Sequence, residues 1–74
     1  MTPGEWEAMF ERQGRRCASC PATSPGPNQR WHTDHDHKTG RVRGILCVSC
    51  NVLVGTLENP RRALAEAYLA RTAA

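Results

Sequence analysis

Four cysteines constrain the fold of this chain more than any other feature. They form two CxxC pairs, Cys17–Cys20 and Cys47–Cys50, separated by 26 residues in a chain of only 74 residues. A chain of this length buries only about 60% of the surface that its unfolded form exposes. Its hydrophobic core is therefore thin, and we expect the cysteines to supply an additional staple.

Three kinds of cysteine chemistry compete at this point. Two disulfides would need an oxidising compartment, and no export signal is visible at the start of the sequence. A redox function would need one CxxC pair beside a βαβ pattern, and neither pair has such a pattern around it. Two CxxC pairs also supply four thiolates to one tetrahedral ion, which we interpret as Zn²⁺ in preference to iron. Structural zinc contributes about 10–16 kcal/mol to folding at neutral pH, enough to stabilise a thin core.

The net charge says little about partners, but the kind of basic residue says more. The formal net charge is +3, and four thiolates with one Zn²⁺ reduce it to about +1. Nine of the ten basic residues are Arg, whose planar guanidinium matches phosphate. The candidates for DNA binding lie beside the first cysteine pair and between the two pairs: Arg15, Arg16, Lys38, Arg41 and Arg43. A merely solvated basic surface is the alternative.

Residues 1–16 are predicted to contain an N-terminal helix. Thr2 and Glu5 form a capping box at its start, and Gly14 is a natural stop. Three apolar side chains at helical spacing are expected to pack in the core: Trp6, Met9 and Phe10.

The remaining pattern predicts a single small α+β domain over residues 1–74, with a zinc-stapled core over 17–57. After the first cysteine pair we expect a loop over 21–29, and then two strands, over 30–34 and 41–46, that are joined by a polar turn over 35–40. A short helix is expected to lead from Cys50 to Leu57. A C-terminal helix is expected over 59–72, starting at Asn59. The longest apolar run is a few residues, against about 20 needed to span a bilayer. We therefore expect no membrane association and a cytoplasmic location.

A dense polar run, from Asp34 to His37, lies at the predicted turn and alternates Asp with His. Neighbouring side chains in a strand point to opposite faces, so Asp34 and His35 share a site only if the backbone between them is distorted. The chemistry suits phosphodiester hydrolysis, because a neutral His activates water near neutral pH and carboxylate or amide oxygens hold Mg²⁺. Asn51 is a candidate amide ligand, and a helix N-cap is its alternative role.

These motifs carry a resemblance to a known family. The segment Cys17-Ala18-Ser19-Cys20 and the run Asp34 to Asn51, DHDHKTGRVRGILCVSCN, resemble the phage recombination endonuclease VII family, which belongs to the HNH or His-Me finger nucleases with a ββα-metal motif. The resemblance covers roughly residues 6–69. It implies a metal-dependent DNA endonuclease of phage origin that nicks duplex or branched DNA in a bacterial cell. Such an enzyme would act alone, as a homodimer or together with a phage protein partner.

The resemblance also implies a role for individual residues. The structural zinc ligands would be Cys17, Cys20, Cys47 and Cys50. Asp34 and Asn51 would hold the catalytic Mg²⁺ or Mn²⁺, His35 would be the general base, and His37 would assist at the phosphate. Asp36 is expected to support the turn, and His32 is expected to be non-catalytic.

Two other functions remain compatible with the pattern. A non-catalytic zinc-finger module that binds nucleic acid would explain the cysteines and arginines, but not the acidic residues, which repel phosphate unless a cation intervenes. A nuclease subunit of a phage packaging machine would cut DNA only in the presence of its partner.

Overall fold

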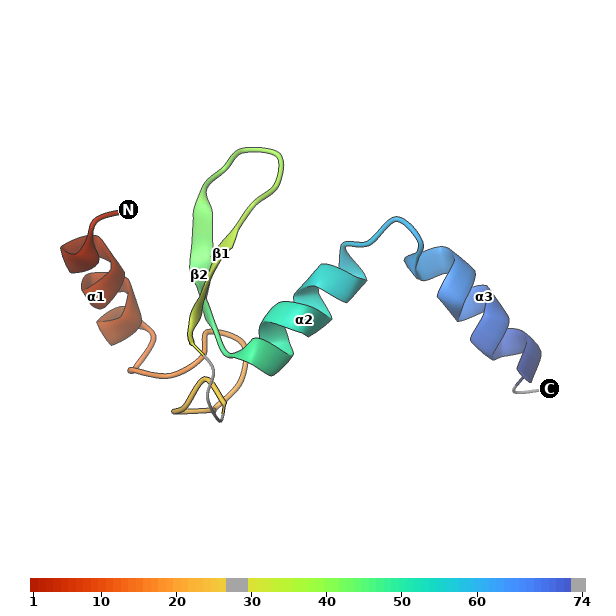
Figure 1. The fold of residues 1–74 in the computed structure, drawn as a ribbon, viewed down its shortest axis with the longest axis horizontal. Coiled ribbons are helices and arrows are strands. Elements are labelled where there is room, and N and C mark those ends of the chain that lie inside the picture. Colours follow the sequence, from red (N-terminus) through yellow and green to blue (C-terminus); the bar gives the residue numbers. More distant parts are fainter. Residues whose placement is uncertain (27–29, 73–74) are drawn as a thin grey trace.

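The chain folds as a small α+β unit, as the sequence predicts. The computed structural model describes residues 1–26 and 30–72. The helices and strands within these residues are, in chain order, α1 (Pro3–Arg12), β1 (His32–His35), β2 (Val42–Leu46), α2 (Val48–Leu57) and α3 (Arg62–Thr72). The predicted loop over 21–29 includes residues 27–29, which lie outside the described residues. Figure 1 shows the β1–β2 hairpin between α1 and α2, with α3 standing apart from it.

Helix α1 begins as the capping box predicts. The Glu5 N–H donates to the Thr2 hydroxyl over 3.1 Å, and the Thr2 N–H donates to the Glu5 carboxylate over 3.0 Å. The helix ends at Arg12, and Gly14 follows the C-cap with a φ of 81°. Glycine tolerates this left-handed conformation without steric cost, so the predicted stop is confirmed.

An aromatic cluster joins α1 to the hairpin. The Phe10 side chain is 6% exposed, and its ring lies 5.0 Å from the rings of both Trp6 and Trp31. The indole N–H of Trp6 donates to the hydroxyl of Thr33 on β1 over 3.2 Å. The predicted core role is therefore confirmed for Phe10, while Trp6 is half-buried and bonds across to the sheet.

The side chain of Gln13 makes a second link between α1 and the hairpin. Its amide oxygen accepts from the Ile45 N–H over 2.8 Å, and its amide nitrogen donates to the carbonyls of Ile45 and Arg16 over 3.1 and 2.8 Å. The Ala18 N–H also donates to the Ile45 carbonyl, over 3.0 Å. Since Ile45 is fully buried, these bonds satisfy backbone groups that water does not reach.

We expect Gln13→Ala to lower the free energy of unfolding by about 1–3 kcal/mol, because it leaves the buried Ile45 N–H without its acceptor. Urea denaturation of the zinc-loaded protein measures this change. Glu66→Ala, at an exposed position on α3, is the control and should change stability by less than about 0.5 kcal/mol. Equal stability of the Gln13 variant and the parent would show that the link contributes nothing.

The hairpin is antiparallel and its turn is organised by Asp36. The Asp36 carboxylate accepts from the N–H groups of Lys38 and Thr39 over 2.8 and 3.1 Å, and these bonds lower its pKa. The turn closes at Gly40, whose φ is 75°. The expectation that Asp36 supports the turn is confirmed. The strands begin one or two residues later than the predicted strands, at His32 and Val42.

Helix α2 begins earlier than the sequence suggests. It starts at Val48, inside the second cysteine pair, and its N-cap is Cys47. Asn51 therefore lies within the helix, and the alternative that it serves as an N-cap is wrong. Because Cys50 now lies on the first turn of α2, the metal-binding pair and the helix form one continuous unit.

The predicted start of the last helix is also corrected. Asn59 does not begin α3; its side-chain oxygen accepts from the Arg61 N–H over 2.8 Å and makes a turn, and the helix starts at Arg62. The expected apolar side chains of α3 are exposed, with Leu64 at 64% and Tyr68 at 56%. Within the described residues, we find no helix with the length and apolar character that a bilayer span requires.

Candidate functional site

The four cysteine thiols gather at one point between the first loop and the start of α2. Their sulfur atoms all lie within 4.8 Å of one another, and the Cys20 and Cys47 sulfurs are 3.7 Å apart. A tetrahedral Zn²⁺ with Zn–S bonds of about 2.3 Å needs sulfur separations of about 3.8 Å. All four thiols are free. The cluster is therefore positioned to bind one metal ion, and its donor set and spacing fit zinc.

The hydrogen bonds around the cysteines prepare the cluster for a cation. Burial raises the pKa of Cys17, but hydrogen bonds from the backbone of Cys47 and from Ser19 and Cys20 outweigh it and lower the pKa to about 6. The Ala22 N–H lowers the pKa of Cys20, yet the neighbouring thiols raise it to about 12. The Cys17 thiolate thus forms readily, whereas the positive charge of a bound metal would favour ionisation of Cys20 beside it.

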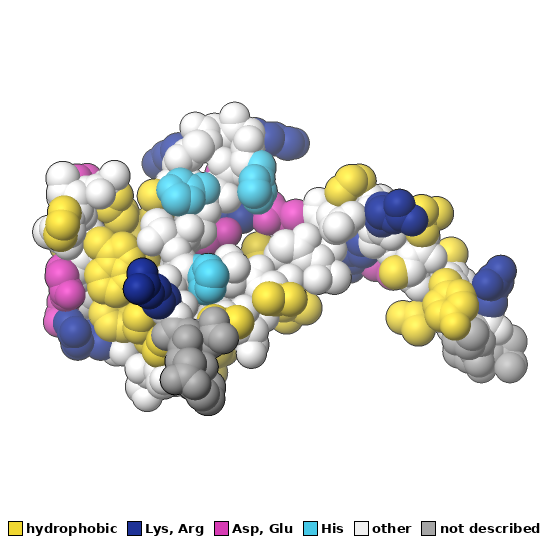
Figure 2. Space-filling view, viewed as in Figure 1, with side chains coloured by type: hydrophobic (Ala, Val, Ile, Leu, Met, Phe, Trp, Pro, Cys, Tyr) yellow, Lys and Arg dark blue, Asp and Glu magenta, His cyan; other side chains and the backbone are white. Residues whose placement is uncertain are grey.

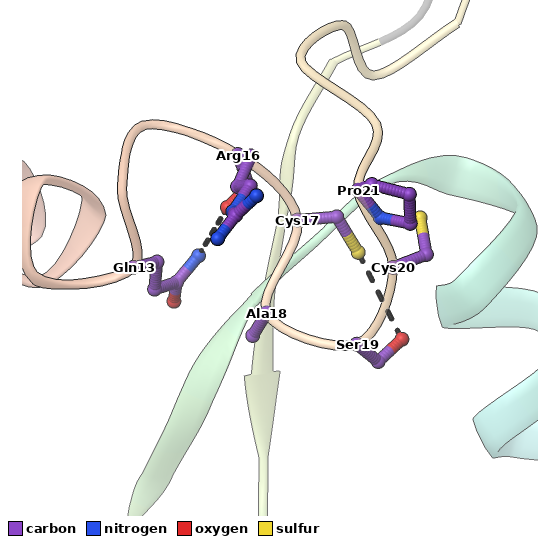
Figure 3. Close-up of a pocket in the computed structure, with 7 residues that line it drawn as sticks. All are labelled: Gln13, Arg16, Cys17, Ala18, Ser19, Cys20 and Pro21. Atoms are coloured by element: carbon purple, nitrogen blue, oxygen red, sulfur yellow. Dashed lines mark hydrogen bonds between the residues drawn. The ribbon is translucent and has the colours of Figure 1, made fainter.

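Figure 3 shows the loop that carries the first cysteine pair, and a cavity of about 360 Å³ lies beside it. The cavity is lined by Gln13, by Arg16 and by residues 17–21. Arg16 is the one DNA-binding candidate in this lining. The predicted catalytic residues are not part of it, so this cavity belongs to the metal-binding loop.

The hairpin is irregular at the step between the two residues that matter most for the predicted chemistry. Asp34 pairs with Gly44, but His35 pairs with Val42, so Arg43 is an extra residue on β2. A bulge of this kind bends and twists the strands locally and changes the direction of nearby side chains. The extra residue, and with it the bent strand, lies on β2, opposite the step from Asp34 to His35.

Arg43 projects from the bulge and connects β1 with the end of α2. Its Nε and Nη2 atoms donate to the two oxygens of Asp34 over 2.7 and 3.0 Å. Its Nη1 and Nη2 atoms donate to the two oxygens of Glu58, the C-cap of α2, over 3.0 and 2.8 Å. These bonds raise the pKa of Arg43 and lower that of Glu58.

A second cavity, of about 270 Å³, is lined by two members of this ion-pair cluster. Asp34 and Arg43 line it together with residues of the first cysteine loop, the hairpin and α2: Ala18, Ser19, Gly44, Leu46 and Val54. The Asp34 side chain is 14% exposed, far less than the exposed acidic partners on α1 and α3. The first predicted catalytic-metal ligand is therefore partly desolvated and reachable from a cavity.

The histidines lie on the accessible surface around the cluster. His35 and His37 are exposed, and His32 is half-buried on β1. His37 lies close enough to Glu58 that it helps to lower the pKa of this carboxyl, after the larger effect of Arg43. Figure 2 shows histidine side chains and acidic side chains together on the face that carries the hairpin and α2.

Apart from Arg16, which lines the first cavity, the predicted DNA-binding residues fall into two groups. Arg15 pairs with Glu7 and Glu11 on α1, and Arg43 pairs with Asp34 and Glu58. Lys38 and Arg41, in contrast, are exposed in the hairpin turn, and their side chains have no ion pair within the described part of the chain. Their charges are thus available to a polyanion.

Two residues of this region are absent from the set predicted from the sequence. Glu58 lies seven residues after Asn51 on α2, a spacing that places both on one helix face, and this pattern could have identified it. Gln13 follows α1 as an ordinary polar residue. No periodicity or motif marks it, since its partner Ile45 is distant in sequence.

Comparisons with known proteins identify relatives of this chain and its family. The Gene 59 protein of Mycobacterium phage D29 is 49% identical over 51 residues, and that of Mycobacterium phage L5 is 47% identical over 51 residues. In both cases the match covers 69% of this chain and 30% of the relative, so the chain matches under a third of each relative's length. No solved structure matches significantly. The family model for recombination endonuclease VII matches residues 1–71. With nearly its whole length matched, the chain belongs to the recombination endonuclease VII family.

Proposed function

We propose that this protein is a metal-dependent DNA endonuclease that hydrolyses phosphodiester bonds at the Asp34–His35 bulge. Family membership supports a nuclease acting on DNA. The observation that carries the finer assignment is the position of Asp34: its partly desolvated carboxylate lines a cavity, and the exposed His35 follows it directly on β1. The order β1, β2, α2 beside a cysteine cluster also supports a ββα-metal, HNH-type assignment.

Each predicted residue has a chemical role in this proposal. His35, exposed at the end of β1, takes a proton from the attacking water. Asp34 and Asn51 offer oxygen ligands, the donor type that Mg²⁺ and Mn²⁺ prefer. A divalent cation held there would neutralise charge on the scissile phosphate and its leaving oxygen. His37 contacts the phosphate, and Lys38 and Arg41 hold the flanking DNA backbone.

The cysteine cluster has a structural role in the proposal. A Zn²⁺ ion bound by the four thiolates would join the loop after α1 to the start of α2, with the hairpin held between them. No thiol then takes part in hydrolysis. Zinc supplies stability and the separate, harder cation supplies catalysis.

Asp34→Asn tests the proposal directly. We expect the rate of plasmid nicking in Mg²⁺ or Mn²⁺ to fall by more than about 100-fold. Loss of a residue that only supports a metal ligand typically costs about 10–100-fold, and this variant loses an ionised oxygen ligand itself. The readout is conversion of supercoiled to open-circular DNA at fixed zinc content. Glu66→Gln, an exposed acidic position on α3, should cut like the parent. A fully active Asp34 variant would refute the metal assignment.

A cleavage assay on a panel of DNA substrates would measure the substrate preference. Supercoiled, linear, single-stranded and four-way-junction DNA, each with several divalent metals, would separate duplex nicking from branched-DNA cleavage. A non-catalytic binding module would instead bind DNA without cleavage at any metal concentration. A partner-dependent packaging nuclease would cut weakly alone and strongly with its phage partner.

A further inference from the structure

The guanidinium of Arg43 lies between two carboxylates that come from different elements. Four hydrogen bonds of 2.7–3.0 Å connect it to Asp34 on β1 and to Glu58 at the end of α2. Arg43 is 35% exposed and Asp34 14%, whereas the Arg62–Glu66 pair on α3 is 50% and 59% exposed. The Asp34–Arg43 pair is thus better shielded from water than the Arg62–Glu66 pair, and its charges interact more strongly, whereas Glu58 is 37% exposed.

Both oxygens of Asp34 are already occupied by Arg43. These are the oxygens that a divalent cation would need, so the guanidinium and the cation compete for one carboxylate. Glu58 binds a second edge of the same guanidinium with both of its own oxygens, through Nη1 and through the Nη2 that also bonds Asp34. Arg43 therefore has a second partner that keeps it paired when Asp34 turns to another cation.

We propose that Arg43 is an internal counter-ion that competes with the divalent cation for Asp34, and that Glu58 is the positioning residue that retains Arg43 once Asp34 is released. The inference rests on the proposed function, since it concerns the same metal site. Its consequence is that Arg43 lowers the affinity of the site for the divalent cation, whereas Glu58 raises it.

The charges determine the sign of each effect. The three side chains carry a net charge of −1. Arg43→Gln removes the competitor and frees both oxygens of Asp34, so the cation should bind about tenfold more tightly. Glu58→Gln leaves Arg43 with Asp34 as its one carboxylate, so the cation should bind about tenfold more weakly. Arg43→Lys keeps the positive charge, so this variant should bind the cation with an affinity close to that of the parent.

The experiment measures Mn²⁺ binding to the zinc-loaded full chain by calorimetry or electron paramagnetic resonance, with circular dichroism to verify the fold. Opposite shifts for Arg43→Gln and Glu58→Gln are expected. Glu66→Gln removes an equivalent charge from the exposed Arg62–Glu66 pair and should leave the affinity unchanged. Shifts in the same direction, or no shift in either variant, would overturn the inference.

The double variant Arg43→Gln/Glu58→Gln tests whether Glu58 acts through Arg43. If it does, the double variant binds Mn²⁺ within about twofold of Arg43→Gln, because no guanidinium remains to be held. If the double variant loses the same factor as Glu58→Gln alone, Glu58 acts directly on the cation and the proposal is wrong.

Asp34→Asn separates this inference from the proposed function. Unchanged Mn²⁺ binding in that variant would place the cation elsewhere and refute the proposed metal site itself. Loss of binding in Asp34→Asn, together with parental affinity in the Arg43 and Glu58 variants, would refute the counter-ion role alone.

Discussion

Replacing His35 by Ala should reduce DNA cleavage by about 10²–10⁴-fold, the usual contribution of a positioned general base. The side chain is exposed at the end of β1, so its removal creates no cavity and breaks no core contact. Zinc content and thermal stability should therefore match the parent. Single-turnover nicking of supercoiled plasmid, with Mg²⁺ in excess, measures the loss in the chemical step.

His32→Ala is the matched control for this experiment. His32 lies on the same strand, three residues earlier, but has no predicted role in hydrolysis. Its replacement should leave the cleavage rate within a few-fold of the parent. If the His35 variant cuts as fast as the parent, or if the His32 variant loses as much activity, the general base has been assigned to the wrong residue.

Replacing a buried zinc ligand, as in Cys47→Ser, should unfold the chain at ordinary temperature. The free energy of structural zinc binding, about 10–16 kcal/mol at neutral pH, becomes available only when the four ligands are assembled. The described hydrophobic residues that are fully buried or nearly so are few: Phe10, Cys17, Ile45, Leu46 and Cys47. Two of these five are themselves metal ligands, so little core remains to hold the fold without the ion.

Far-UV circular dichroism and zinc content together measure this effect. Ser49→Ala is the control, because Ser49 lies inside the second cysteine pair but is exposed and is not a ligand; it should fold and retain zinc. Chelation of zinc from the parent should reproduce the Cys47 variant. A Cys47 variant that keeps the parental spectrum without bound metal would show that the cluster is not a structural zinc site.

The two predictions affect different properties because the two sites do different work. Loss of a cysteine removes the fold and the activity together, whereas loss of His35 removes activity from a folded protein. The clusters are nevertheless adjacent, since Ala18 and Ser19 of the first cysteine loop line the cavity that contains Asp34. Zinc bound to this loop would thus hold one wall of the proposed catalytic pocket.

Local sequence signals were sufficient for much of this fold. The capping box of α1, the glycine that ends it, the hairpin and the convergence of two cysteine pairs were all predicted, because each depends on residues close in sequence or on a ligand set with fixed geometry. The errors lie at the helix starts, at Val48 and Arg62, where several residues compete as caps.

The tertiary structure alone decided which charged side chains face one another. The sequence places Arg43 among the DNA-binding candidates and Asp34 among the metal ligands, and nothing in their spacing shows that the two are bonded. The bulge at Arg43 and the length of α2, which brings Glu58 to the same guanidinium, create that contact. Such ion pairs depend on the relative placement of elements distant in sequence, and no local propensity encodes it.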